Sequence, residues 1–184
     1  MKAVTERDIR ASFVNCSKGE AQRLPLPRGF AELPWEDLDF LGWLDLSAPD
    51  RAYLVVQRDD VPGDGTEGDG EEGDSSERDG TLVGVTLRYP SRRRGFLHRT
   101  MCSLCLTTHP GGGVSLMAAR KRGRAGREGN SVGLYMCTDL ACSLYVRGKK
   151  AAAPGSRMEE TLTVEQQTER LRANLLGFLD QLGP

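Results

Sequence analysis

The sequence predicts an α+β fold, in which helices flank a small antiparallel sheet. A capping-box pattern near the start of the chain and an amphipathic stretch at its end predict the helices. Two pairs of runs rich in alternating or β-branched apolar residues predict the strands. A length of 184 residues and a hydrophobic content of 38% suffice for one domain with a core. We therefore expect a single domain over residues 1–184.

The two best-marked helices are expected near the ends of the chain. Thr5 and Asp8 have the spacing of an N-cap and its partner at the third helical position, and Thr163 and Gln166 repeat this spacing. The second of these helices has an apolar stripe at helical spacing, made of Leu171, Leu175, Phe178, Leu179 and Leu182. We expect the stripe to close the domain core, and docking of a partner helix is the alternative.

Two β-hairpins are expected in the middle of the chain. Residues 53–57 and 82–87 have strand character, and an acidic stretch at about 59–80 separates them. This stretch lacks the apolar residues whose burial would offset the entropic cost of ordering it, so we expect a disordered insertion. Residues 114–119 and 132–136 form the second pair. The Gly/Arg-rich stretch between them is expected to be a mobile, extended turn.

Four cysteines form two closely spaced pairs, Cys102-x-x-Cys105 and Cys137-x-x-x-x-Cys142. Zn²⁺ takes thiolates in sets of four, and a Cys-x-x-Cys turn lets two sulfurs converge on one ion. Thr138 is a candidate N-cap for a helix that carries the last cysteine. A cysteine knuckle, a hairpin and a ligand-bearing helix occur in this order in treble-clef zinc fingers. The sequence therefore predicts one structural zinc and a zinc-binding core at about 98–150.

Three other interpretations of the cysteines stay open: two disulfides, a redox Cys-x-x-Cys motif and buried free thiols. The first residues of the chain contain no apolar signal segment, so we expect a cytoplasmic protein in a reducing compartment, which disfavours disulfides. His109 is a possible replacement ligand, although the proline and glycines that follow it favour a plain loop histidine, and His98 has no ligand spacing. Cys16 is expected to be a small apolar residue near the end of the first helix.

Charge is strongly segregated along the chain, although the formal net charge is only −1. Residues 59–79 include ten acidic residues and one arginine, whereas residues 88–127 include ten basic residues and no acid. Such clustering usually has an electrostatic use, so we expect an anionic partner, and a solvated basic face is the alternative. The candidate partner-binding residues are Arg120, Lys121, Arg122, Arg124, Arg127, Arg147, Lys149 and Lys150.

Several segments of the chain resemble the FBP family, which includes the FusB-type fusidic acid resistance proteins that bind elongation factor G. The resemblance is strongest in residues 101–105 (MCSLC) and 129–150 (GNSVGLYMCTDLACSLYVRGKK), and residues 35–43 and 51–56 are similar to short actinobacterial members. It implies a treble-clef zinc domain with Cys102, Cys105, Cys137 and Cys142 as ligands. The third ligand of the family can be a histidine, where this chain has Cys137.

The resemblance also implies a function, which is binding to elongation factor G and promoting its release from the ribosome. The alternative is an RNA- or ribosome-binding zinc-finger protein that acts through the basic loop. A zinc hydrolase or deaminase is disfavoured, because four cysteine ligands leave no open position for water and the sequence has no His-x-Glu signature. We therefore expect no enzymatic activity and no small-molecule substrate. We also expect no membrane insertion, because no apolar run approaches the ~18–20 residues needed to cross a bilayer.

Overall fold

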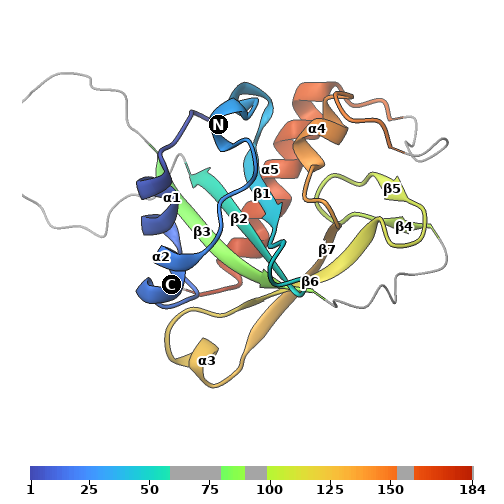
Figure 1. Cartoon of the computed structure of the whole chain (residues 1–184). Helices are drawn as coiled ribbons and strands as arrows, with labels where there is room; N and C mark the ends of the chain where they lie inside the picture. The colour runs from blue at the N-terminus through green and yellow to red at the C-terminus, as the bar shows by residue number, and fades with distance from the viewer. Residues whose placement is uncertain (59–79, 90–98, 153–159, 184) are drawn as a thin grey trace, which may run out of the picture.

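A five-stranded antiparallel sheet forms the centre of the molecule (Figure 1). The computed structural model describes residues 1–58, 80–89, 99–152 and 160–183. The strands of the sheet, in their spatial order, are β1 (Phe40–Leu44), β2 (Arg51–Arg58), β3 (Thr81–Arg88), β6 (Val114–Arg120) and β7 (Ser131–Cys137). A second, two-stranded sheet pairs β4 (Thr100–Met101) with β5 (Thr108–His109). The predicted α+β fold class is confirmed.

Both predicted hairpins are present. Strands β2 and β3 pair along their whole length, from Arg51 opposite Arg88 to Arg58 opposite Thr81. Strands β6 and β7 also pair throughout, from Val114 opposite Cys137 to Arg120 opposite Ser131. The two hairpins share only a short ladder between β3 and β6. The predicted disordered insertion, the arginines at 92–94 and His98 lie outside the described residues, except that Gly80 precedes β3.

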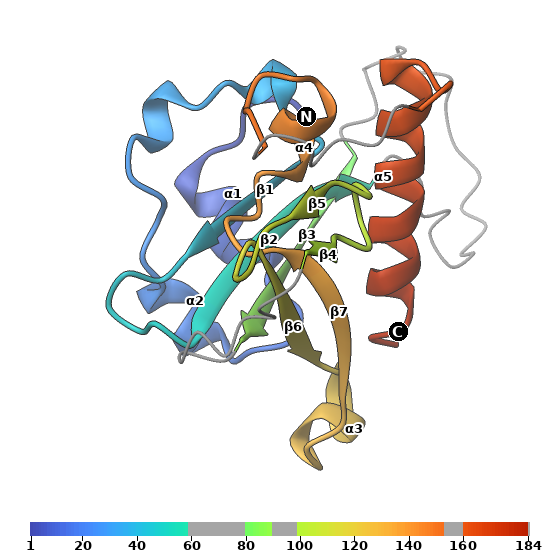
Figure 2. The same ribbon diagram turned by 90° about the vertical axis from the view of Figure 1, so that its right-hand side faces the viewer.

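Helices cover both faces of the sheet, as Figure 2 shows with α5 on one side and α1 and α2 on the other. The helices are α1 (Glu6–Ser12), α2 (Lys18–Arg23), α3 (Gly123–Arg127), α4 (Cys142–Val146) and α5 (Val164–Asp180), with short 3₁₀ turns at Phe30–Glu32 and Trp35–Asp37. Capping boxes start α1 at Thr5 and α5 at Thr163, as predicted, and a third one starts α2 at Ser17. Each such cap satisfies backbone donors that the first helical turn leaves unpaired.

The side chains of β2 divide the core into two halves. Alternate residues Ala52, Leu54 and Val56 contact the half that includes α5 and the four cysteines. Tyr53 and Val55 face the half that lies under α1 and α2. The predicted apolar stripe of α5 is buried in the first half, so it closes the core as expected. Burial of each such large apolar side chain contributes about 1.5–3 kcal/mol relative to leaving it exposed.

Two local predictions are wrong. The Gly/Arg-rich stretch is not an extended turn but the short helix α3, because Gly123 (φ 61°) and Gly129 (φ 94°) bend the chain at both ends. A side chain at Gly126 would also place its Cβ only 1.8 Å from the Lys121 carbonyl oxygen, so glycine allows the tight return. Cys16 lies in the connection between α1 and α2 rather than near the end of α1, although it packs against apolar core residues as expected.

Within the described ranges, no helix combines the length and the apolar character that a bilayer-spanning segment requires.

The packing of α1 against β3 predicts opposite effects for two glycine substitutions. A Cβ at Gly84 would lie 2.5 Å from Ser12 Oγ and 3.1 Å from the Phe13 ring, so Gly84→Ala should lower the free energy of unfolding by about 1–3 kcal/mol. Gly177 in α5 has open space around the same position, so Gly177→Ala should raise that free energy by about 0.5–1 kcal/mol. Urea unfolding of the two variants and the wild type measures both values. Equal effects would contradict the close approach of α1 to Gly84.

Candidate metal centre

The structure brings the four predicted cysteines together. Their Sγ atoms all lie within 4.8 Å of one another, and all four side chains are buried. The closest contacts join the two sequence pairs: Cys102 Sγ lies 3.7 Å from Cys142 Sγ, and Cys105 Sγ lies 3.5 Å from Cys137 Sγ. The cluster therefore connects the knuckle at residues 102–105 to the end of β7 and the start of α4.

The spacing of the sulfurs fits a tetrahedral zinc ion. Four sulfurs at the usual Zn–S distance of about 2.3 Å lie about 3.8 Å apart in a tetrahedron, close to the observed contacts. None of the four cysteines forms a disulfide. The donor set also suits zinc, because tetrahedral thiolate sites typically hold zinc or iron–sulfur centres, and one ion here would complete its coordination with protein ligands.

The pKa values of the clustered thiols shift in opposite directions, because ionisation of one buried sulfur disfavours ionisation of its neighbours. The pKa of Cys105 lies well below the ordinary thiol value, because its sulfur accepts hydrogen bonds from Cys102 and other thiols of the cluster. The pKa values of Cys142 and Cys137 lie well above it, because Cys102 and Cys105 disfavour further ionisation beside them. Four buried thiolates cannot coexist without a positive charge between them, and a divalent ion supplies that charge.

Two leucines in the left-handed backbone region shape the cysteine loops. Leu106 (φ 57°) follows the first pair, and Leu140 (φ 55°) lies between Cys137 and Cys142. The Leu106 amide donates to the Cys102 carbonyl at 3.0 Å, and the Leu140 amide donates to the Cys137 carbonyl at 2.9 Å. Residues with side chains rarely adopt positive φ, so this conformation stores backbone strain at the site. These left-handed turns fold the chain around the cysteine sulfurs.

Polar residues form a second layer around the cluster. His109 is buried on β5, and its Nε2 lies 3.2 Å from Cys137 Sγ. Its ring packs edge-on against Tyr145 of α4, whose hydroxyl donates to Asp139 at 2.7 Å. Burial alone would raise the pKa of Asp139, but hydrogen bonds from Lys150 and Tyr145 bring it below its ordinary value. Such outer partners orient metal ligands and tune the charge on them.

The prediction of a plain loop histidine is therefore wrong for His109. It is neither a loop residue nor one of the four clustered ligand donors but a neighbour of a ligand. Glycine at position 113 leaves room for the His109 side chain, because a Cβ on Gly113 would lie 2.4 Å from His109 Cβ. Thr138 is not an N-cap either: α4 begins at Cys142, and the Thr138 hydroxyl donates to the Gly112 carbonyl.

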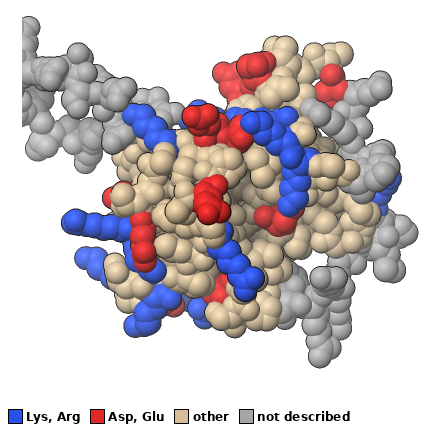
Figure 3. Space-filling model, turned by 45° about the horizontal axis from the view of Figure 1, so that its top comes forward, with Lys and Arg blue, Asp and Glu red and all other residues tan. Residues whose placement is uncertain are grey.

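Ion pairs attach the residues that follow α4 to the segment that precedes β1. Arg147 donates to both carboxylate oxygens of Asp39, at 2.6 and 2.9 Å, and the Asp39 side chain is only 5% exposed. The Asp39 amide also donates to the buried Ser143 hydroxyl at 3.0 Å. Lys149 pairs with Asp37 at 2.6 Å. Figure 3 shows the result on this side of the molecule, where acidic and basic side chains are interspersed.

The candidate partner-binding cations thus fall into two separate groups. The first group, from Arg120 to Arg127, lies at the α3 end of the β6–β7 hairpin, whereas the cysteines lie at the other end. Six residues of strand separate the two ends, which corresponds to roughly 20 Å. The second group, Arg147, Lys149 and Lys150, pairs with acids beside the cluster. Sequence proximity to the cysteines did not reveal this separation.

Helix α5 braces the knuckle from the opposite side. Asn174 Nδ2 donates to the carbonyl oxygens of Ser103 and Leu104, at 3.2 and 3.1 Å. The Ser103 amide in turn donates to the Tyr135 carbonyl of β7 at 2.8 Å. The knuckle is therefore held by a helix, a strand and the sulfur cluster together.

Knuckle, β6–β7 hairpin and α4 follow one another in the order of a treble clef, with two cysteines at each end. A family model described as "FBP C-terminal treble-clef zinc-finger" matches residues 8–66 and 75–182. The chain belongs to this family. The match covers the α1–α2 layer, the sheet and α5 as well as the cysteine cluster, so the FBP unit includes all the described layers. A comparison with curated proteins finds no match.

Loss of one FBP cluster cysteine should abolish stoichiometric metal binding. Cys137→Ser removes one of four sulfurs from a buried site, whereas Cys16→Ser changes a cysteine outside the cluster. We expect about one zinc per chain in the wild type and in Cys16→Ser, and well under half of that in Cys137→Ser. Elemental analysis of the purified proteins measures these values. Full occupancy in a folded Cys137→Ser variant would contradict the ligand set.

Proposed function

We propose that this FBP-family zinc-finger protein binds elongation factor G and promotes its release from the ribosome. The observation that supports the proposal is the family match over both halves of the chain, because FBP proteins are known as non-enzymatic binders of this factor. The four clustered sulfurs, Cys102, Cys105, Cys137 and Cys142, are its proposed zinc ligands. Four protein ligands leave no coordination position for a reacting water, so the proposed role of the metal is structural.

An exposed apolar surface beside the cluster is the proposed docking site. Leu116 and Tyr135 lie directly opposite each other on β6 and β7, and their exposed fractions are 42% and 38%. Met101 has an exposed fraction of 40% and lies on β4, just before the knuckle. The knuckle is held to β7 by the hydrogen bond from the Ser103 amide to the Tyr135 carbonyl. Exposed apolar residues that gather in one place often mark protein-binding sites, and tyrosine and methionine are enriched there. We call these three residues the knuckle patch.

The cations have two proposed roles. Arg120, Lys121, Arg122, Arg124 and Arg127 at the α3 end are proposed to steer the protein toward an acidic surface of the factor, which raises the association rate more than the affinity. Arg147, Lys149 and Lys150 already pair with acids, so we propose that they mainly hold α4 in place below the partner. Exposed ion pairs of this kind are weak, and the lysines remain available to a partner at small cost.

Release of the factor requires different affinities for its two states. A protein that binds the ribosome-released conformation more tightly than the bound one shifts the equilibrium toward release, without making or breaking a bond. The proposed place of action is the cytoplasm, where both elongation factor G and reduced thiols are found.

The knuckle patch and the metal should both be needed for binding. We expect micromolar or tighter affinity for purified elongation factor G at low salt, and a loss of about tenfold or more in Tyr135→Ala, because a central aromatic contact is typically worth 2 kcal/mol or more. Leu46→Ala is the matched control, since Leu46 is exposed but follows β1 at the far edge of the sheet from β7. Calorimetry with and without a chelator measures partner binding and metal dependence together.

Absence of binding at micromolar concentrations and low salt would contradict the proposal. RNA binding that falls steeply with salt, combined with indifference to the factor, would favour the RNA-binding alternative. If Tyr135→Ala and Leu46→Ala weakened binding equally, elongation factor G would still be the partner, but the knuckle patch would not be the docking site.

A further inference from the structure

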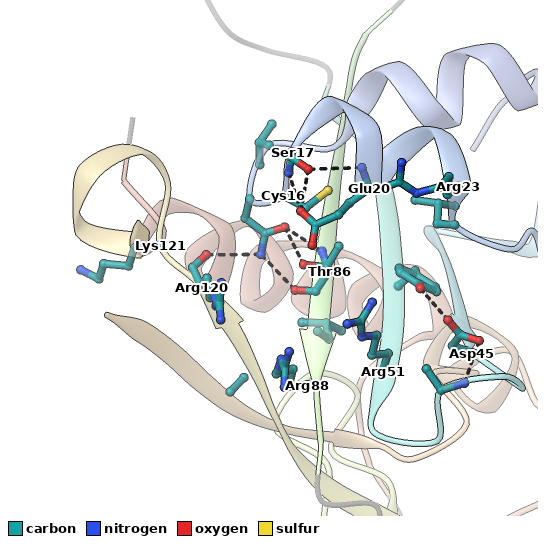
Figure 4. A pocket seen from close by; sticks show the side chains of 18 of the residues that line it. Cys16, Ser17, Glu20, Arg23, Asp45, Arg51, Thr86, Arg88, Arg120 and Lys121 are labelled. Atoms are coloured by element: carbon teal, nitrogen blue, oxygen red, sulfur yellow. Dashed lines mark hydrogen bonds between the residues drawn. The ribbon is translucent and has the colours of Figure 1, made fainter. Parts of the chain in front are cut away.

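A cavity of about 820 Å³ lies on the α1–α2 face of the sheet, away from the cysteine cluster. Its walls come from α2, the first residues of β2, the last residues of β3, and the junction of β6 and α3 (Figure 4). The described residues that line it include six cations, which are Arg23, Arg51, Arg88, Arg120, Lys121 and Arg127. Among the residues that the structure describes, two acids, Glu20 and Asp45, line it as well. We call this cavity the arginine pocket.

The two acids offset only part of the positive charge of the pocket, because six cations face them among the described lining residues. Their carboxylate oxygens also accept hydrogen bonds within the protein. Asp45 accepts from the Ser47 hydroxyl at 2.6 Å and from the Tyr53 hydroxyl at 2.7 Å, one on each carboxylate oxygen. Glu20 accepts from the Ser17 amide and hydroxyl in the α2 capping box, at 2.9 and 2.7 Å. Asp45 therefore stabilises the connection between β1 and β2, and Glu20 stabilises the start of α2.

Most of these cations lie beyond ion-pair distance of any acid in the described part of the chain. Among the described residues, Arg23, Arg51, Arg120, Lys121 and Arg127 form no ion pair with an acid within 4.0 Å, and Arg88 forms only a long, exposed one with Asp50 at 3.5 Å. Charges at this density attract an external anion.

Two of the arginines lie where their positive charges repel each other. Arg51 and Arg88 are direct cross-strand partners on β2 and β3, so their side chains lie on the same face of the sheet. Like charges in directly opposite positions destabilise an antiparallel pair. An anion between the two guanidinium groups would convert this repulsion into two favourable contacts. Figure 4 shows both side chains below Glu20 and Thr86 in the pocket.

Asn15 fixes the wall between the two hairpins. Its Nδ2 donates to the carbonyl oxygens of Thr86 and Arg120, and its Oδ1 accepts from the Thr86 amide at 2.7 Å. These bonds fill the gap where β3 and β6 diverge beyond their short ladder. The backbone that carries Arg120 is thus held at a set position relative to the backbone of β3, which gives the pocket a preformed shape.

We propose that the arginine pocket binds a small ligand with two or three linked phosphate groups, of the size of a nucleoside di- or triphosphate. The cavity volume lies within the usual range of about 300–1,000 Å³ for small-molecule sites. Guanidinium groups bind phosphate oxygens in a bidentate manner, and several of them together recognise a polyphosphate better than a single charge. The excess of cations over acids in the lining matches the charge of such a chain.

A compact ligand fits the pocket better than an extended one. The cations converge on one cavity from α2, β2, β3 and the β6–α3 junction instead of following a line along the surface. Leu24 and Pro25, which follow α2, and Ala48 between β1 and β2 add apolar area to the lining, against which the uncharged part of the ligand would lie. The proposal concerns the isolated chain and does not depend on binding to elongation factor G.

Calorimetric titration of the zinc-loaded protein with AMP, ADP, ATP and inorganic tripolyphosphate tests the proposal, in low salt without added magnesium. Affinity should rise with the number of phosphates, and tripolyphosphate should compete with ATP. Arg51→Gln and Arg88→Gln should each weaken ATP binding by about tenfold. Neither residue belongs to the proposed steering group, so these variants leave that surface intact.

Arg28→Gln is the matched control, because Arg28 is an exposed arginine outside the pocket lining. Its ATP affinity should stay within about twofold of the wild type, because only nearby charges contribute strongly. Three results would overturn the proposal: no binding of ATP or tripolyphosphate at millimolar concentrations, equal losses in Arg28→Gln and Arg51→Gln, or an RNA oligonucleotide that binds the same arginines far more tightly than ATP does. Thermal unfolding curves of each variant confirm that a lost signal is not a lost fold.

Discussion

The convergence of four cysteine sulfurs is the constraint on which the rest of this protein depends. The two cysteine pairs are separated by a hairpin, and neither cysteine loop has a regular backbone of its own. A structural zinc site of this kind contributes on the order of 10 kcal/mol to folding, which exceeds what the short elements nearby supply. β4, β5 and α4 each comprise five residues or fewer, which is too short for independent stability. The metal therefore cross-links these short elements at the edge of the apolar core that includes α5.

From the cluster, rigidity extends into the sheet through a small number of polar contacts. Arg147 and Ser143 connect α4 to Asp39, which directly precedes β1, and Asn174 connects α5 to the knuckle. The pKa of Arg147 is raised by its hydrogen bonds to Asp39, so the guanidinium group stays charged over the physiological range. Because Asp39 is buried, its charge needs this partner. The bonds of Asn174 to the knuckle and of the Ser103 amide to the Tyr135 carbonyl hold the backbone of the knuckle patch, so we expect the proposed docking surface to depend on metal binding.

The features that sequence reasoning predicted are those encoded by local patterns. The capping boxes at Thr5 and Thr163 need only side chains three residues apart, and the stripe of α5 is visible as a period in one segment. The four cysteines were found because zinc restricts the spacing within each pair. His109 contacts Cys137, 28 positions away, and Arg147 contacts Asp39, 108 positions away. No local sequence pattern predicts contacts over such separations. Likewise, the cross-strand pair Arg51–Arg88 appears only once the register of β2 and β3 is known.

X-ray absorption at the zinc edge of the freshly purified wild-type protein tests the central claim most directly. The account predicts one zinc per chain, surrounded by four sulfur atoms at about 2.3 Å and no nitrogen in the first coordination sphere. A sphere with three sulfurs and one nitrogen would mean that His109, which lies 3.2 Å from Cys137 Sγ, takes the place of a cysteine. Protein without zinc but with both cysteine pairs oxidised would contradict the account as a whole.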